Sequence, residues 1–270
     1  MASEQQTAPV ERTTQQLRGR KAIVTGASSG IGRATAERLA REGASVCVNY
    51  YADSDREAAE EVVRSIELSG TRGIAVQADV GAEDQVRRMV ESASRAFGGL
   101  DLLVNNAGIE KRFDLLEMSL ADWDRVLRTN LTGSFLCLRE AARVMAQTAG
   151  GVIVNMSSVH ESIPWPGFAH YCASKGGLRL LMQTAARELA PLNIRIVNIA
   201  PGAIITPINR FVLDDPDATR ALQEEIPLGR MGQPDEIASA VVWAASDEAG
   251  YVTGTTIVVD GGISLYPRFL

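Results

Sequence analysis

Short, β-branched apolar runs alternate along most of the chain with longer stretches whose apolar residues recur every three to four positions. Val86, Met89, Val90 and Ala93 show this helical spacing. Because the runs are almost continuously apolar, the pattern predicts a parallel sheet with helices on both faces. The predicted buried strands are 21–25, 45–50, 73–77, 100–105, 151–156, 194–199 and 256–260.

Two segments depart from this alternation. Residues 1–16 are polar and predict a disordered tail before a domain that spans 17–270. Residues 201–232 contain no clean strand and several prolines. A long segment after a strand of a parallel sheet lies over the carboxyl ends of the strands, where ligands bind. We therefore interpret 201–232 as a substrate lid, with an ordinary surface loop as the alternative.

Composition excludes several classes of partner. The formal net charge is −6 and no stretch is strongly basic, so a nucleic-acid partner is not expected. No apolar run approaches the roughly 18 residues that a membrane span needs, so no membrane partner is expected. Three cysteines without a CxxC pair indicate a reducing, cytoplasmic location. With only two histidines, a His-rich metal site is excluded, and we expect no metal.

A glycine-rich turn follows the first predicted strand and leads into a helix. Glycines let the backbone turn tightly and approach a pyrophosphate, whose charge is stabilised by the amides at the helix N-terminus. A glycine triplet alone is weak evidence, but between a strand and a helix it predicts a dinucleotide site. The turn residues expected to bind the dinucleotide are Gly26, Ser28, Ser29, Gly30, Ile31 and Gly32.

The end of the second predicted strand is where NAD is distinguished from NADP. An acidic side chain there binds the ribose 2′-hydroxyl, whereas an arginine favours a 2′-phosphate. This chain has Asn49, Tyr50 and Tyr51, which carry neither charge. Tyr51 and the serines of the glycine turn can still offer hydroxyl groups. We predict that NAD and NADP are both accepted, with a weak preference.

Four polar residues predict proton chemistry beside that dinucleotide. Tyr171 and Lys175 lie four residues apart on a predicted helix and share one face. A phenol with a pKa of about 10 is too weak an acid at neutral pH. A nearby ammonium and the positive nicotinamide ring would lower its pKa into the working range. Ser158 ends the fifth strand, and the amide of Asn130 can hold a water that relays protons to Lys175.

Taken together, these motifs resemble one enzyme family. TGASSGIG, NNAG, the asparagine of TNLTGSF, Ser158, YCASK and the Pro-Gly after the sixth strand resemble the short-chain dehydrogenase/reductase family. The resemblance begins near residue 17 and implies a single Rossmann-type domain with a doubly wound, seven-stranded parallel sheet. It also implies a catalytic tetrad of Asn130, Ser158, Tyr171 and Lys175.

The same resemblance implies further cofactor contacts. Asp79, with Val80, would lie near the adenine, and the Asn-Ala-Gly segment would lie beside the second ribose. The stretch after the sixth strand would embrace the nicotinamide. The remaining implied cofactor residues are Asn106, Ala107, Gly108, Pro201, Gly202, Ile204 and Thr206, together with Tyr171 and Lys175.

Segments 155–177, 201–209 and 251–267 also resemble bacterial glucose 1-dehydrogenases. This closer resemblance implies a homotetramer that oxidises D-glucose at C1 to the lactone, with the phenolate of the tetrad as general base. A sugar presents hydroxyls on all sides, so its pocket needs several polar side chains. The candidate substrate residues are Ser158, His160, Tyr171, Glu110 and Asn209.

Two other functions remain open. A carbonyl reductase or alcohol dehydrogenase, such as a 3-oxoacyl-carrier-protein reductase, would share the tetrad. Recognition of an acyl carrier favours a basic surface near the cleft, whereas the lid segment carries Asp214, Asp215 and Asp217. A non-catalytic dinucleotide sensor would typically lack the tyrosine or the lysine. Trp165 is a candidate wall of the active site, and residues 266–270 are predicted to reach a neighbouring subunit.

Overall fold

The computed structural model describes residues 15–265, so the predictions for residues 1–14 of the tail and for 266–270 lie outside the described range. Within that range the chain forms a seven-stranded sheet in the order β3-β2-β1-β4-β5-β6-β7, and every pairing is parallel. The strands are β1 (Lys21–Val24), β2 (Ser45–Tyr50), β3 (Gly73–Gln77), β4 (Leu102–Asn105), β5 (Gly151–Met156), β6 (Ile194–Pro201) and β7 (Thr256–Val259). The predicted doubly wound parallel sheet is confirmed.

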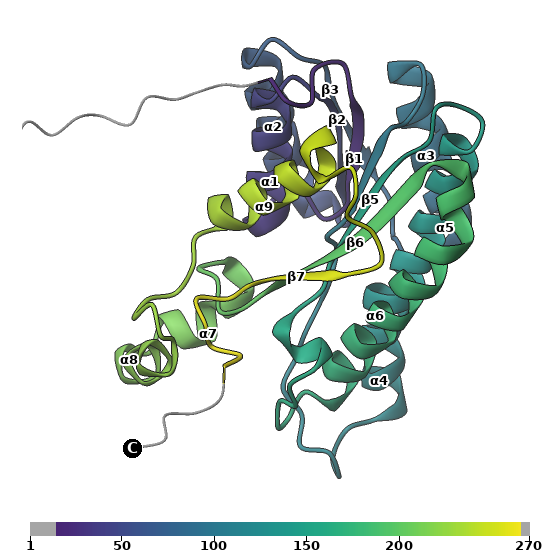
Figure 1. The fold of residues 1–270 in the computed structure, drawn as a ribbon. Coiled ribbons are helices and arrows are strands. Elements are labelled where there is room, and N and C mark those ends of the chain that lie inside the picture. The colour runs from purple at the N-terminus through teal and green to yellow at the C-terminus, as the bar shows by residue number, and fades with distance from the viewer. Residues whose placement is uncertain (1–14, 266–270) are drawn as a thin grey trace, which may run out of the picture.

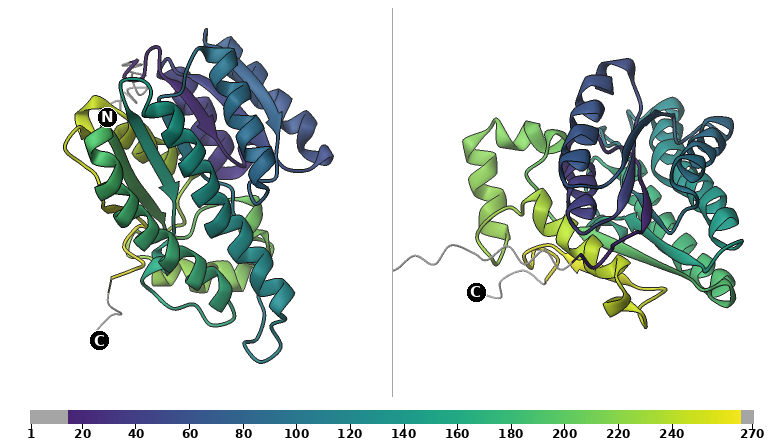
Figure 2. Two further views of the ribbon diagram at one scale, coloured as in Figure 1. Left: turned by 90° about the vertical axis from the view of Figure 1, so that its right-hand side faces the viewer. Right: turned by 90° about the horizontal axis from the view of Figure 1, so that it is seen from above.

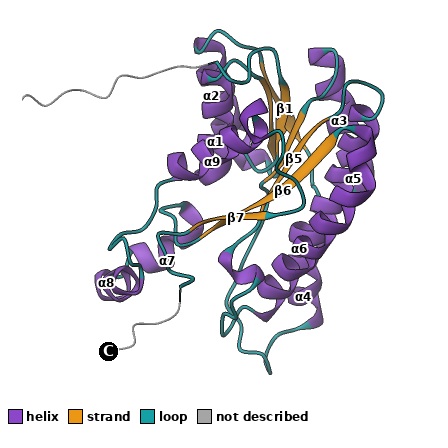
Figure 3. Cartoon of the chain, viewed as in Figure 1, coloured by secondary structure: helices purple, strands orange, loops and turns teal. Residues whose placement is uncertain are grey.

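Helices cover both faces of the sheet (Figures 1 and 3). The longer helices are α1 (Gly30–Arg41), α2 (Arg56–Leu68), α3 (Glu83–Phe97), α5 (Gly133–Met145), α6 (Ala169–Leu189) and α9 (Pro234–Ala245). One apolar cluster joins α1, α2 and α9 to the sheet, and a second joins α3, α5 and α6 to the other face. Ala22 and Val24 of β1 belong to the first cluster and Ile23 to the second, as the alternation of strand side chains requires.

The strand order reverses between β1 and β4, which are neighbours in the sheet. Consecutive strands extend from β1 in one direction and from β4 in the other. The loops after these two strands therefore diverge and open a crevice at the carboxyl ends of the strands, where α/β proteins of this type bind ligands. The glycine-rich turn follows β1, and the Asn-Ala-Gly segment follows β4.

The helical segment around Asn130 is composite. α4 (Leu120–Leu127) ends before a π-helical turn at Arg128–Thr132, and α5 begins directly after it. Gly133 is required at that junction, because a Cβ there would lie 2.8 Å from Cγ2 of Val80. The wider turn places Asn130 in the interior, where it is 1% exposed.

Segment 201–232 leaves the sheet at the end of β6 and contains α7 (Arg210–Leu213) and α8 (Pro216–Glu225). Figures 1 and 2 show that both helices project beyond the two helical layers. Asp215 caps α8 by accepting hydrogen bonds from its first amides, and the helix buries none of its side chains. A bridge between Ile204 and Gly232 joins the two ends of the segment. The segment is therefore an arm anchored at its base, and its role as a lid stays a prediction.

Candidate active site

A cavity of about 1260 Å³ opens along the carboxyl edge of the sheet. Pockets for small ligands are typically about 300–1,000 Å³, so this one has room for a dinucleotide and a substrate together. The loops after β1, β4, β5 and β6 all contribute to its lining, as do α6 and the arm. Apart from Asn130, every residue that the sequence predicted for cofactor, catalysis or substrate lines this cavity.

The glycine-rich turn is shaped for close approach of a ligand. Gly26 and Gly30 have φ values of +60° and +55°, which favour glycine. A Cβ at Gly32 would lie 2.3 Å from the carbonyl oxygen of Gly26, so no larger residue fits there. Ser29 begins α1 without a capping hydrogen bond from its side chain, and it lines the cavity. The exposed amides at the start of α1 therefore fit the pyrophosphate of a dinucleotide.

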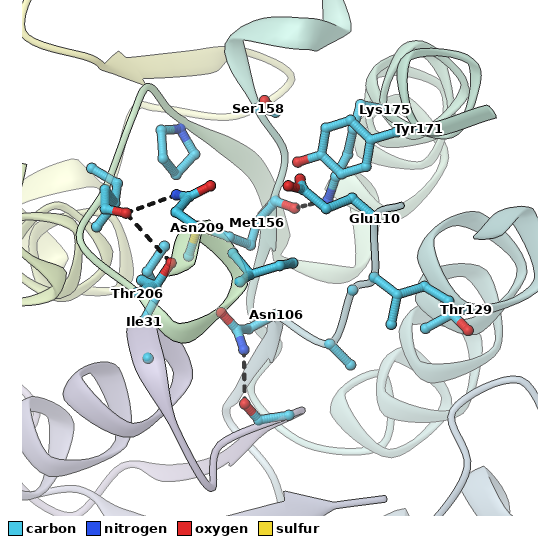
Figure 4. A pocket seen from close by; sticks show the side chains of 18 of the residues that line it. Ile31, Asn106, Glu110, Thr129, Met156, Ser158, Tyr171, Lys175, Thr206 and Asn209 are labelled. Atoms are coloured by element: carbon cyan, nitrogen blue, oxygen red, sulfur yellow. Dashed lines mark hydrogen bonds between the residues drawn. The ribbon is translucent and has the colours of Figure 1, made fainter. Parts of the chain in front are cut away.

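Two polar side chains, Thr25 and Asn106, tie this turn to the loop after β4. The amide of Asn106 donates to the carbonyl oxygens of Thr25 and Gly26, at 2.9 and 3.0 Å. In return, Oγ1 of Thr25 accepts from the backbone amides of Asn106 and Ala107. These four bonds clamp the two sides of the crevice together, and Figure 4 shows Asn106 at its floor.

Asn49 forms a second clamp, which the sequence analysis did not foresee. Its Oδ1 accepts from the amide of Gly26, and its Nδ2 donates to the carbonyl oxygens of Val76 and Ala78. The side chain is therefore committed to holding β1, β2 and β3 together. Of the three residues considered for cofactor selection, Tyr51 is the exposed one, and Asp55 beyond it also lines the cavity.

Tyr171 and Lys175 lie on α6 and face the middle of the cavity (Figure 4). Nζ of Lys175 is 5.5 Å from the centre of the Tyr171 ring and donates to the carbonyl oxygen of Met156 at 2.7 Å. Ser158 follows β5 and hydrogen-bonds the side chain of Tyr171. Its Oγ also accepts from the amide of His160 at 3.2 Å, which starts the short 3₁₀ turn Val159–Glu161.

Known proteins are similar to this one over almost the whole chain. A family model described as enoyl-(acyl carrier protein) reductase matches residues 26–264. The 3beta-hydroxysteroid dehydrogenase 1 of Eggerthella lenta is 48% identical, over 94% of this chain and 97% of the relative. Glucose 1-dehydrogenase 2 of Bacillus subtilis is 41% identical, over 94% of this chain and 98% of the relative. A solved short-chain type dehydrogenase/reductase from Mycobacterium marinum aligns with a TM-score of 0.87 at 36% identity, covering 93% of this chain and 98% of that one.

The chain belongs to the short-chain dehydrogenase/reductase family. Membership implies an oxidoreductase that uses a nicotinamide dinucleotide, which agrees with the shape of the glycine-rich turn. Among residues 15–265, no group of three or more His, Cys, Asp or Glu side chains is placed to hold a metal ion. Within the same range, no helix is long and apolar enough to cross a membrane.

In this short-chain dehydrogenase/reductase, burial shifts the pKa values of both Tyr171 and Lys175. Burial raises the pKa of Tyr171, the charge of Glu110 raises it further, and the hydrogen bond with Ser158 opposes both. Burial also lowers the pKa of Lys175 to about 8, against the charges of Glu110 and Glu161. Burial dominates at both groups, because the low-dielectric site disfavours both charged forms. The lowering of the phenol pKa by Lys175 together with the nicotinamide ring stays a prediction.

Glu110 is the most unusual carboxyl group of the site. Burial raises its pKa to about 7, although the charge of Lys175 opposes this. Its Oε1 is buried and has no hydrogen-bond partner among the described residues. Figure 4 shows its carboxyl group directed toward the hydroxyl of Tyr171 and the amine of Lys175. An unpaired buried acceptor in a ligand cavity favours contact with a bound hydroxyl group.

His160 presents a defined acceptor to the cavity. Its Nδ1 lies 3.1 Å from the carbonyl oxygen of Ile163, and a carbonyl only accepts, so Nδ1 carries the proton. Burial lowers its pKa, which favours the neutral ring with a bare Nε2. The ring stacks on Trp165 at 4.4 Å, and Trp165 also stacks with Phe168. The candidate wall residue Trp165 thus lines the cavity and holds His160 in place.

Asn130 lies behind the site and does not line the cavity. Its Oδ1 accepts from the amide of Ile109, and its Nδ2 donates to the carbonyl oxygen of Ile109 and to Oγ of Ser174. Both amide protons are therefore used within the protein. The side chain fixes the loop after β4 against α6, beside Lys175, and only a second lone pair of Oδ1 remains for the predicted water.

Proposed function

We propose that the protein interconverts an alcohol and a carbonyl compound at Tyr171, with D-glucose oxidised at C1 to the lactone as the leading reaction. The observation that carries this proposal is the convergence of Ser158, Tyr171 and Lys175 on one cavity with unpaired acceptors at Glu110 and His160. When bound, the dinucleotide supplies the hydride acceptor and a positive charge that favours the phenolate.

The chain's own groups then handle the proton. Tyr171, as phenolate, accepts the proton of the substrate hydroxyl, and Ser158 hydrogen-bonds the same oxygen. Lys175 provides positive charge beside the phenolate, and its link to the carbonyl oxygen of Met156 fixes its position. Asn130 holds the loop after β4 in place and accepts from a water on the proton's exit route.

The dinucleotide would lie along the crevice between β1 and β4. The glycine-rich turn and the start of α1 would hold the pyrophosphate, with Asp79 and Val80 near the adenine. Pro201, Gly202 and the following arm residues would close around the nicotinamide. Both NAD and NADP are accepted in this proposal, and the carboxylate of Asp55 tilts the weak preference toward NAD by repelling a 2′-phosphate.

Glucose is favoured by the polar part of the lining. Nε2 of His160, the carboxyl group of Glu110 and Oδ1 of Asn209 offer acceptors for sugar hydroxyls around Ser158 and Tyr171. Nδ2 of Asn209 donates to the carbonyl oxygen of Ile204 at 2.8 Å, which leaves its oxygen for a ligand. The relative named glucose 1-dehydrogenase 2 supports the same substrate.

A 3β-hydroxysteroid is the second candidate, and the apolar part of the lining favours it. A rigid polycyclic skeleton would need a long apolar wall beyond the reacting hydroxyl. The cavity offers one in Ile163, Pro164, Trp165, Val212, Leu222 and Ile263. The relative named 3beta-hydroxysteroid dehydrogenase 1 supports this substrate class.

One assay panel separates these substrates. The purified protein is incubated with D-glucose, other aldoses, a 3β-hydroxysteroid and a 3-hydroxyacyl thioester, each with NAD and with NADP, while formation of reduced cofactor is followed. Fast turnover of glucose supports the leading reaction. Turnover of the steroid with none of glucose would replace it by the second candidate. Binding of reduced cofactor without turnover of any substrate would indicate a sensor.

The same preparation tests the predicted assembly. We propose a homotetramer, following the resemblance to glucose 1-dehydrogenases. Light scattering during gel filtration of the full chain should give about four times the chain mass of 29.0 kDa. A monomeric mass would contradict the assembly and leave the reaction unaffected.

A further inference from the structure

Glu161 is a carboxylate that the proposed chemistry does not use, yet its side chain is only 5% exposed. Its Oε2 accepts from Oγ of Ser157 at 2.6 Å and from Nδ2 of Asn198 at 3.3 Å. Its Oε1 accepts from Oγ1 of Thr256 at 2.8 Å and lies 3.8 Å from Nε of Arg179. One carboxylate thus joins the residue after β5, the interior of β6 and the first residue of β7 to α6.

A row of buried amides leads to this carboxylate across the sheet. Asn105, Asn155 and Asn198 are direct neighbours on β4, β5 and β6. Asn105 donates to Oδ1 of Asn155, and Asn155 donates to Oδ1 of Asn198, each at 3.0 Å. All three amides point their donors toward Glu161, so the row ends in the one group that accepts without donating. A glutamine at 161 can still accept from Ser157 and Asn198 with its single oxygen, but it removes the negative charge. Its NH₂ group would then stand where Oε1 accepts from Thr256 and faces Arg179.

Glu161 also closes the 3₁₀ turn that carries two residues of the site. Its amide donates to the carbonyl oxygen of Ser158, and Ser158 and His160 lie within the same turn. The side-chain bonds therefore hold this turn against the sheet edge. Through that turn they fix where Oγ of Ser158 meets the hydroxyl of Tyr171.

The charge of Glu161 acts in addition on Lys175. Lys175 faces Tyr171 on its own helix, Glu110 from the loop after β4, and Glu161 from the turn after β5. Burial lowers the pKa of Lys175, while the charges of both carboxylates raise it. Arg179 lies beside Glu161 but is half-exposed, so solvent screens its opposing charge.

We propose that Glu161 is a positioning residue for hydride transfer: it aligns Ser158 through the turn after β5 and keeps Lys175 charged. This proposal rests on the proposed reaction at Tyr171 but not on the identity of the substrate. It assigns an acidic residue outside the tetrad to the same proton chemistry.

The decisive variant is Glu161→Gln, compared with Glu161→Asp and with Glu91→Gln, an exposed residue on α3. We expect Glu161→Gln to lower kcat by about tenfold or more, because small misplacements of a catalytic group are costly. The alkaline limb of kcat/KM should move to lower pH by about half a unit or more, because Lys175 loses its charge sooner. Glu161→Asp should lower kcat but leave the alkaline limb of kcat/KM at its wild-type pH. Glu91→Gln should change neither kcat nor the limb.

A merely structural role predicts a different result. It would lower the melting temperature of Glu161→Gln while leaving kcat per folded enzyme and the pH limb as in wild type, and this would overturn the proposal. If Glu161→Gln does not fold, Glu161→Asp and Thr256→Val decide. Both keep the charge and should lower kcat severalfold without moving the limb, so wild-type kcat in both would overturn the proposal.

A crystal structure of the Glu161→Gln holoenzyme gives a readout without any substrate. We expect the turn after β5 to shift and Oγ of Ser158 to leave the hydroxyl of Tyr171. An unmoved Ser158 would contradict the positioning role. Failure of the wild type to oxidise any substrate of the panel would instead contradict the proposed reaction.

Discussion

The two halves of the cavity are built in different ways. On the proposed dinucleotide half, the ligand surface is mainly backbone, shaped by glycines and held by the side-chain amides of Asn49 and Asn106. On the proposed substrate half, the surface is made of side chains on α6, on turns and on the arm. Three of its groups, Glu110, Tyr171 and Lys175, have strongly shifted pKa values. We interpret the backbone surface as the part that binds the cofactor, which is used whatever the substrate, and the side chains as the part that determines which substrate reacts.

Tyr171→Phe should show the largest difference between an effect on catalysis and an effect on cofactor binding. Loss of the phenol hydroxyl should lower kcat by about 10³-fold, because general base catalysis contributes about 10²–10⁴-fold. The dissociation constant for reduced cofactor, measured by fluorescence, should change little. A loss of cofactor binding as large as the loss of kcat would show that Tyr171 shapes the dinucleotide half instead.

Gly32→Ala should have the converse effect, because it acts on cofactor binding. A Cβ there would meet the Gly26 carbonyl oxygen at 2.3 Å, so the turn must move. Cofactor binding should weaken by about 100-fold, or roughly 3 kcal/mol. Gly70→Ala is the control, because nothing lies within 4 Å of its added Cβ, and its only strain is the positive φ of +82°. Gly70→Ala should cost about 1–2 kcal/mol of stability, because alanine disfavours positive φ, and leave cofactor binding intact. Equal binding by Gly32→Ala and Gly70→Ala would contradict the backbone-cradle description.

Glu110→Gln probes the substrate half through pH. Burial raises the pKa of Glu110 to about 7, so the folded protein binds a proton more tightly than the unfolded chain does. Stability should therefore fall as pH rises from the unfolded value of about 4.3 to about 7. Over that pH interval, the free energy of unfolding of the glutamine variant should fall by about 2 kcal/mol less than that of the wild type. Urea unfolding at a series of pH values measures this. Parallel stability curves for the two proteins would show that Glu110 does not titrate as described.

The smallest expected effect is on cofactor choice. Asp55→Asn should improve NADP binding relative to NAD by about two- to fivefold, the range for an exposed charge interaction. Asp53→Asn is the control, because Asp53 is exposed and does not line the cavity. A wild-type preference above about 1000-fold, or roughly 4 kcal/mol, would contradict the predicted dual acceptance.

The sequence predicted the architecture well because its strands and the glycine turn depend on local patterns. Apolar runs mark buried strands, and the turn after β1 needs glycine for reasons of backbone geometry. Even there the boundaries moved. β1 ends at Val24 because Thr25 instead anchors the loop after β4. β6 extends to Pro201, beyond the predicted 199.

The misses concern groups whose role depends on distant partners. Asn49 and Asp55 could not be assigned from strand-end spacing, because β3 and the start of α2 determine what each side chain faces. The buried hydrogen bonds of Asn130 arise from a π-helical turn that helical periodicity does not reveal. The rise in the pKa of Tyr171 comes from burial, and an i, i+4 spacing to lysine carries no information about solvent access.

The arm that ends in α8 has a consequence for how such enzymes diversify. Because α8 buries none of its side chains, substitutions on it leave the packing energy of the sheet and its two helical layers unchanged. Residues of this arm, among them Ala218 and Leu222, nevertheless line the cavity. We therefore predict that mutations at this helix change substrate range while hydride transfer and folding are inherited intact.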